Sequence, residues 1–219
     1  MSQQNLKQIK DLNGDAIKEI FVHAKDVAAL HATLTSPRGN FFRKRLLQYL
    51  SGGLTQEEVE KLRQEFGVQE TERHINRLLA YKLIESKEIH ETAGYIRTPL
   101  GETAVNLIRE LERKALGERA KKIFHAALGE NSIQFFLKVY GSPKKPTGGD
   151  IIFTPLEIGQ ISRSLSLHRY IEGIAAIDKL DDAGLVSYLK DGNIHLNPKR
   201  STAFYYYLKG LHSILKDLK

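Results

Sequence analysis

Apolar residues recur every three or four positions along most of the chain, which is the pattern of amphipathic helices. The clearest case is Asp15–Leu34, where this stripe includes Ile17, Ile20 and Val27. The same pattern predicts helices over residues 40–50, 55–66, 69–81, 98–116, 120–128, 132–140, 154–164, 167–183 and 201–218. We therefore expect a mainly helical protein.

Two short β-like hairpins interrupt the helical pattern. Leu83–Ile89 and Tyr95–Thr98 are predicted to form the first. Leu185–Leu189 and Asn193–Leu196 are predicted to form the second, around Asp191-Gly192, a dipeptide typical of two-residue hairpin turns. Each hairpin follows a pair of helices and precedes a long one, so the sequence predicts two similar modules in tandem.

Both modules have a capping box at the start of the first helix of the pair. Thr55 and Glu58 form it in the first module, and Thr154 and Glu157 form it in the second. In the first module, the helix that begins there ends at Gly67, where a tight turn leads into the next helix. This arrangement is that of a helix-turn-helix.

Composition narrows the possible chemistry. The 219 residues include no cysteine, which excludes disulfides, zinc–thiolate sites, iron–sulfur clusters and cysteine nucleophiles. No apolar run approaches the roughly 20 residues of a membrane span, and the first residues do not resemble a signal peptide. These features favour a cytoplasmic protein.

The formal net charge is +7, and it is unevenly distributed. Residues 1–116 have 18 basic and 16 acidic side chains, whereas residues 117–219 have 15 and 10. A basic surface is the usual property of a nucleic-acid-binding protein, but solubility alone also explains such a balance.

The stretch Leu54–Gly101 resembles the winged-helix family of DNA-binding domains. The resemblance rests on the capped helix, the turn Gly67-Val68, the helix Gln69–Tyr81 and the hairpin that follows. In bacterial regulators of this family, the last wing strand often runs into a threonine, a glycine and a long helix. Thr98 and Gly101 occupy those places here.

Phe153–Leu208 is similar to a more divergent copy of the same family, since Asp181–Val186 ends a helix in glycine before two apolar strand residues. The resemblance implies a mainly α fold with small β-hairpin wings: two winged-helix domains in tandem plus an N-terminal helix. The expected boundaries are residues 1–37 for the N-terminal helix, 38–116 for the first domain and 117–219 for the second, with a helical connector at 117–140.

The resemblance also implies candidate DNA contacts. Arginine can bond to guanine and glutamine to adenine, and short polar side chains can bond to phosphate. The candidates are Gln69, Thr71, Arg73, His74 and Arg77 in the first recognition helix, Lys87 and Arg97 in the first wing, Ser166, His168, Arg169 and Tyr170 in the second recognition helix, and Lys190, Lys199 and Arg200 around the second hairpin. A solvated helix face of mixed charge is the alternative, favoured by Glu70 and Glu72.

Other motifs give little support to catalysis. Tyr205-Tyr206-Tyr207 could suggest a tyrosine nucleophile, but packing in a helix explains it as well. The histidines lack the spacing of a metal site, and the loop at Lys144-Lys145 lacks the order of a nucleotide-binding P-loop. That loop is either a phosphate contact or a solvated linker. We expect no enzymatic activity and no cofactor.

The sequence thus leads to a functional hypothesis with alternatives. We expect a transcriptional regulator that reads double-stranded DNA and forms a homodimer through the apolar stripes of Asp15–Leu34 and Thr98–Leu116. The alternative is a tandem winged-helix scaffold that binds a protein partner, in chromosome organisation or replication initiation, because fold alone does not decide function.

Overall fold

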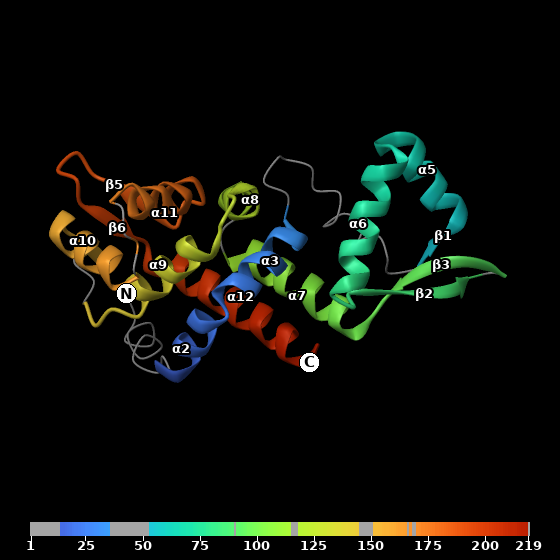
Figure 1. Ribbon diagram of the computed structural model, residues 1–219, viewed down its shortest axis with the longest axis horizontal. Helices are drawn as coiled ribbons and strands as arrows, with labels where there is room; N and C mark the ends of the chain where they lie inside the picture. The colour runs from blue at the N-terminus through green and yellow to red at the C-terminus, as the bar shows by residue number, and fades with distance from the viewer. Residues whose placement is uncertain are drawn as a thin grey trace.

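The computed structural model describes residues 14–35, 53–89, 91–114, 118–144, 151–165, 167 and 170–218. Over these ranges the protein is mainly helical, with two small three-stranded antiparallel sheets (Figure 1). The helix predicted for residues 40–50 lies outside the described residues.

The elements follow the predicted order closely. The first half contains α2 (Gly14–Val22), α3 (Ala24–Leu34), β1 (Leu54–Thr55), α5 (Gln56–Phe66), α6 (Val68–Ala80), β2 (Ile84–Ile89), β3 (Thr92–Arg97) and α7 (Pro99–Lys114). The second contains α8 (Glu118–His125), α9 (Glu130–Tyr140), β4 (Ile151–Phe153), α10 (Pro155–Ser164), α11 (Tyr170–Asp182), β5 (Val186–Tyr188), β6 (Ile194–Leu196) and α12 (Pro198–Asp217). The single helix expected over Asp15–Leu34 is broken at His23, and the short strands β1 and β4 were not predicted.

Both sheets have the same topology. Their strand orders are β1-β3-β2 and β4-β6-β5, so in each the last strand of the hairpin lies in the centre. Leu54 pairs with Tyr95 in the first sheet, and Ile151 pairs with Leu196 in the second. Each half therefore repeats one order of elements: a short strand, two helices, a hairpin and a long helix.

The repeat extends to the end of the second helix of each pair. Both α6 and α11 have 13 residues. Lys82 and Gly184 follow them with positive φ angles of 48° and 67°. The next amide, of Leu83 or Leu185, donates back to a helix carbonyl at 3.0 or 2.9 Å. The left-handed residue thus ends each helix and starts each hairpin.

Both predicted capping boxes are present. In the second, the Glu157 carboxylate also accepts from the ammonium of Lys144 at 2.6 Å, and these bonds lower the pKa of Glu157 to about 2. Lys144 donates as well to the carbonyl of Ile152 at 2.7 Å. Its ammonium therefore bonds to two groups within the protein. Lys145 lies outside the described residues, and a phosphate contact by this loop stays a prediction.

Thr98 and Gly101 join the hairpin of the first module to α7. The Thr98 hydroxyl donates to the carbonyl of Lys82 at 2.5 Å and accepts from the amide of Gly101 at 3.1 Å. A Cβ on Gly101 would lie 2.0 Å from the carbonyl oxygen of Leu83. The glycine is thus required where the first turn of α7 meets the backbone at the end of α6.

The two modules lie toward opposite ends of an elongated molecule and meet through long central helices (Figure 1). α7, the last helix of the first module, packs along α12, the last helix of the second. A Cβ on Gly210 of α12 would come within 2.3 Å of the Leu107 side chain, so the two helices approach closely. α3 packs against both α9 and α12.

These contacts cover the apolar stripes from which we predicted a dimer. Ile20, Val27 and Leu30 of α2 and α3 are fully buried, as are Val105 and Ile108 of α7. The length of these stripes is therefore explained within one chain.

α9 lies within the segment that the sequence predicts to be a connector, but it belongs to a core. It packs against α10, α11 and α3, and its Phe135 and Phe136 are fully buried. In the second module, α10 and α11 both pack against α9.

The three consecutive tyrosines of α12 have different surroundings, as packing predicts. Tyr205 stacks on Tyr140 with ring centroids 5.0 Å apart, and Tyr206 is 44% exposed. Tyr207 is buried, and its hydroxyl lies 3.2 Å from Nδ1 of His31. Burial raises the pKa of Tyr205 and of Tyr207, which disfavours the phenolate of a nucleophile.

We expect Gly101→Ala to destabilise the protein by about 1–3 kcal/mol, because the new methyl group meets backbone that cannot yield without moving α7. Gly159→Ala is the matched control: apart from its chain neighbours and the backbone of its own helix, no atom lies within 4 Å of the ideal Cβ of this glycine, so alanine should be neutral or stabilise by about 0.5–1 kcal/mol. Urea unfolding followed by circular dichroism measures both. Equal effects at the two positions would contradict the close packing at Gly101.

His31 makes stability depend on pH. Burial lowers its pKa from 6.5 to about 4, so the unfolded chain binds a proton between these values while the folded chain does not. Its contribution to stability is complete above pH 6.5 and is lost as the pH falls toward 4. The free energy of unfolding of the natural protein should therefore fall between pH 7 and pH 4.5. In the His31→Gln variant, which has no imidazole to protonate, we expect this fall to be smaller by roughly 2–3 kcal/mol. Urea unfolding at both pH values tests this, and parallel losses would contradict it.

Candidate nucleic-acid interface

The outward face of α6 carries a row of hydrogen-bonding side chains. Gln69, Arg73, Asn76 and Arg77 are exposed and follow one another at spacings of four, three and one residues. Residues at such spacings share one side of a helix. We call them the α6 outer row. Its Asn76 escaped the sequence analysis, although its position three residues after Arg73 indicates the same face.

The two acidic residues of α6 pair with neighbouring cations. Glu72 forms an ion pair with Arg63, which links α6 to α5. Glu70 forms one with Arg73 and lies 3.0 Å from Nε2 of His74. Burial opposes the ionisation of Glu70, but Arg73 and His74 outweigh it and lower the pKa of Glu70. The negative charge that favoured a solvated face is thus largely neutralised within the protein.

Two residues predicted to contact DNA are buried instead. Thr71 is fully buried, and its hydroxyl donates to the carbonyl of Leu62 in α5 at 3.2 Å; His74 is 4% exposed. The prediction was wrong because it took only apolar residues as the inner side of α6. Thr71 and His74 continue the inner row of Ile75 toward α5.

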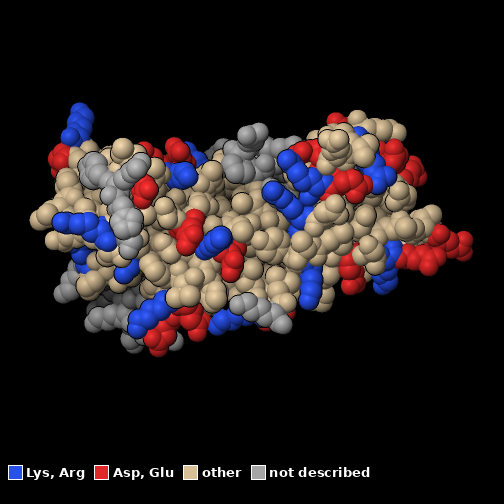
Figure 2. Space-filling model, viewed as in Figure 1, with Lys and Arg blue, Asp and Glu red and all other residues tan. Residues whose placement is uncertain are grey.

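The first wing offers few cations. Lys87 is exposed on β2, but Glu85 and Glu88 flank it on the same strand. Arg97, also predicted to contact DNA, is 10% exposed and forms an ion pair with Glu102 at 2.6 Å. The predicted role of Arg97 is therefore wrong, because its guanidinium joins β3 to α7. Figure 2 shows acidic side chains at the end of the molecule where this hairpin lies.

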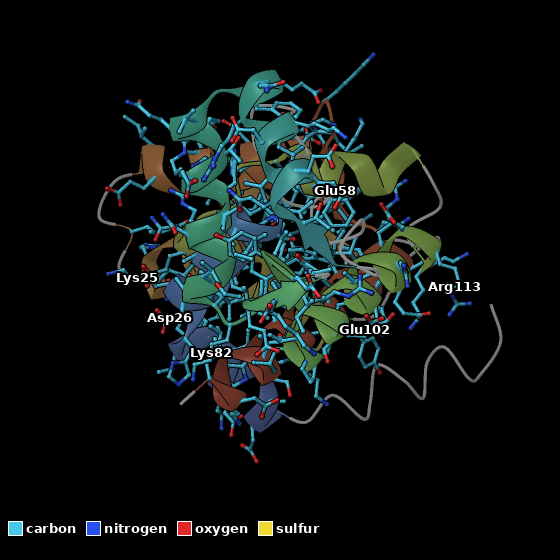
Figure 3. The ribbon with its side chains drawn as sticks, turned by 90° about the vertical axis from the view of Figure 1, so that its right-hand side faces the viewer. Lys25, Asp26, Glu58, Lys82, Glu102 and Arg113 are labelled. Carbon is cyan, nitrogen blue, oxygen red and sulfur yellow. The ribbon has the colours of Figure 1, made fainter. Side chains whose placement is uncertain are left out.

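Charges of both signs surround this module. In the view onto its end, Lys25, Asp26 and Lys82 lie on one side, and Glu102 and Arg113 lie on the other (Figure 3). Figure 2 shows basic and acidic side chains interspersed over most of the visible face. On this face the charges of the two signs do not separate into one large basic patch.

The candidates in the second module are scattered. Ser166, His168 and Arg169 lie outside the described residues, as does the side chain of Tyr170. Lys190 and Lys199 are exposed, at the hairpin turn and in the first turn of α12. Arg200 is half-buried and donates to the carbonyl of Gly184 at 2.7 Å, so it joins α12 to the turn after α11; a phosphate contact by Arg200 stays a prediction.

The outward face of α11 differs in chemistry from that of α6. At the positions equivalent to the α6 outer row and the residue that ends α6, α11 carries a different set of exposed side chains. We call them the α11 outer row: Ile171, Ala175, Asp178, Lys179 and Asp182. This row contains one lysine and two aspartates, and its first residue, Ile171, is 73% exposed.

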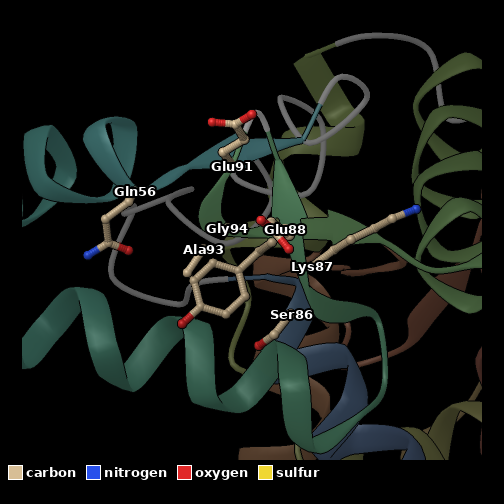
Figure 4. A pocket seen from close by; sticks show the side chains of 8 residues that line it. Gln56, Ser86, Lys87, Glu88, Glu91, Ala93 and Gly94 are labelled. Carbon is tan, nitrogen blue, oxygen red and sulfur yellow. The ribbon is translucent and has the colours of Figure 1, made fainter.

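A shallow hollow lies between the start of α5 and the first hairpin (Figure 4). Gln56 lies on one side, and the ammonium of Lys87 points away from it on the other. The polar groups do not converge on a common point. The hollow is lined by Gln56, Ser86, Lys87, Glu88, Glu91, Ala93, Gly94 and Tyr95.

Within the described part of the chain, histidine, aspartate and glutamate side chains form no group of three or more that could hold a metal ion. None of the described helices combines the length and the apolar composition that crossing a membrane requires.

Comparison of the chain with protein-family models, with curated proteins and with solved structures finds no match.

We expect Thr71→Val to lower stability by about 0.5–1.5 kcal/mol, because it removes the hydrogen bond from α6 to α5 and preserves the shape of the side chain. Gln69→Ala, on the exposed side of the same helix turn, should change stability by less than about 0.5 kcal/mol. Thermal unfolding of the two variants compares them. A larger loss for Gln69→Ala would reverse the assignment of inner and outer faces.

Proposed function

We propose that the protein binds double-stranded DNA through α6, with the two modules acting as winged-helix domains in tandem. The shared order of elements and the shared strand order of the two sheets support this fold. So do Thr98 and Gly101, whose contacts fix the junction between wing and long helix that the resemblance predicts.

The observation that carries the proposal is the α6 outer row. Arginine can donate two hydrogen bonds to O6 and N7 of guanine, and the amides of glutamine and asparagine can bond to N6 and N7 of adenine. Arg73, Arg77, Gln69 and Asn76 thus form a set of base-reading side chains on the second helix of a helix-turn-helix, which enters the major groove in proteins of that type.

The ion pair between Glu70 and Arg73 suggests how the row is held before binding. The carboxylate keeps the guanidinium on the outward face of α6 and partly neutralises it. Neutralisation weakens non-specific attraction to phosphate, whereas the donor groups of Arg73 that do not contact Glu70 can still bond to a base. The arrangement therefore favours sequence reading over general phosphate binding.

Sequence-specific DNA binding of this kind is most consistent with regulation of transcription. We further propose that the protein forms a homodimer. Since the apolar stripes of α2, α3 and α7 are covered within the chain, a dimer would use another surface. Light scattering after size exclusion separates a monomer of 24.8 kDa from a dimer.

A protein-binding scaffold is the second candidate. The apolar and acidic residues of the α11 outer row favour it, because such a surface repels phosphate. The two candidates are compatible if each module has its own partner.

The test uses duplexes of randomised sequence, from which the natural protein selects its preferred site. On the selected duplex we expect Arg73→Ala with Arg77→Ala to weaken binding by about 100-fold or more, since each bidentate base contact contributes about 1–3 kcal/mol. Glu70→Gln should strengthen binding to duplexes of unrelated sequence, because it releases the charge of Arg73. Fluorescence anisotropy measures both.

Arg109→Ala with Arg113→Ala is the matched control. These arginines are also exposed and four residues apart, on α7. The same charge is removed away from α6, so binding to the selected duplex should change less than about threefold. Equal losses for the two pairs, or failure to select any sequence, would reject specific reading by α6.

A further inference from the structure

The α11 outer row is an exposed helix face with an apolar beginning and an acidic end. Ile171 is 73% exposed at the N-terminal end, Ala175 follows one turn later, and Asp178 and Asp182 lie further along the same side. Lys179, next to Asp178, contributes one positive charge.

The second hairpin extends this surface. β5 contacts α11, and the hydroxyl of Tyr188 donates to Asp178 at 3.0 Å. Tyr188 is 42% exposed and the next residue, Leu189, is 38% exposed. The apolar part of the surface is therefore contributed by both the helix and the hairpin. We call this surface, formed by the α11 outer row with Tyr188 and Leu189, the α11–wing face.

Asp181, which lies beside this face on α11, has carboxylates among its neighbours. Burial and repulsion from Asp182 and Asp178 raise the pKa of Asp181, while Lys122 of α8 partly offsets this. By contrast, the acidic residues of α6 have arginine partners in Arg63 and Arg73. Asp178 and Asp182 are exposed, so an external cation can reach their carboxylates.

We propose that the α11–wing face binds a basic segment of a protein partner, one that carries apolar side chains beside its lysines or arginines. The charge of the face decides the class of partner, because carboxylates repel the phosphates of nucleic acid and attract basic side chains. Exposed isoleucine, tyrosine and leucine supply the apolar contacts that typically anchor such interfaces. The proposal goes beyond DNA binding by α6 and does not depend on it.

The probe is a synthetic peptide of about 20 residues with leucines along one helical side and lysine or arginine elsewhere. Added to the isotope-labelled full chain, it should shift the amide resonances of α11 and β5. Asp178→Lys with Asp182→Lys should weaken its binding about tenfold or more, and Ile171→Ser should weaken it severalfold. If the lysine variant does not fold, Asp178→Asn with Asp182→Asn replaces it. This variant should also weaken peptide binding, by a smaller factor.

Glu85→Lys with Glu88→Lys is the matched control. It reverses the charge of two exposed acids on the first wing, so the net charge changes by the same amount at another site. Peptide binding should then fall less than about threefold, a loss that general attraction over the whole surface would explain. Arg73→Ala with Arg77→Ala should leave peptide binding unchanged, which separates this test from that of DNA reading.

Three results would overturn the proposal. The first is an equal loss of peptide binding in the two charge-reversed variants. The second is duplex binding that depends on Ile171 and Asp178. The third is self-association that the lysine variant of Asp178 and Asp182 abolishes, since it would show that a second copy of the chain occupies the face.

Discussion

The packing of α7 on α12 is the contact on which the arrangement of the molecule depends. Each of these helices follows directly from the central strand of a sheet, so their crossing sets the position of one module relative to the other. Gly210 permits the close approach to Leu107, and His31 with Tyr207 joins the N-terminal helices to α12. Without these contacts the two modules would be joined by little more than their linking chain.

This central packing also gives a reason for the long apolar stripes. A domain that binds a second copy of itself needs an exposed apolar surface, whereas here α3, α7, α9 and α12 cover one another. The chain thus joins two modules of the same topology, one toward each end, without a second molecule. The outer rows of α6 and α11 differ in sequence, whereas the two halves of a symmetric homodimer would carry identical surfaces.

Local signals predicted the fold well, and packing decided what they missed. Thr55 and Thr154 mark the starts of two helices because capping depends on neighbouring residues. His74 was misplaced because it lies on the buried side of α6. Thr71 and Arg97 were misplaced because their partners come from α5 and α7, and a polar side chain in sequence does not show which element it faces. The short strands β1 and β4 were missed for a similar reason: their pairing partners are distant in sequence.

The same backbone therefore presents two different chemistries. α6 and α11 have the same length, the same place in the fold and the same left-handed end, so the backbone does not distinguish them. Their outer rows do: Gln69, Arg73 and Arg77 face outward from one, and Ile171 and Asp178 from the other. A helix face that bonds to bases needs donors and tolerates little negative charge, which describes the α6 outer row better than the α11 outer row. This difference is the basis of the division of roles that we propose, with DNA for the first module and a basic polypeptide for the second.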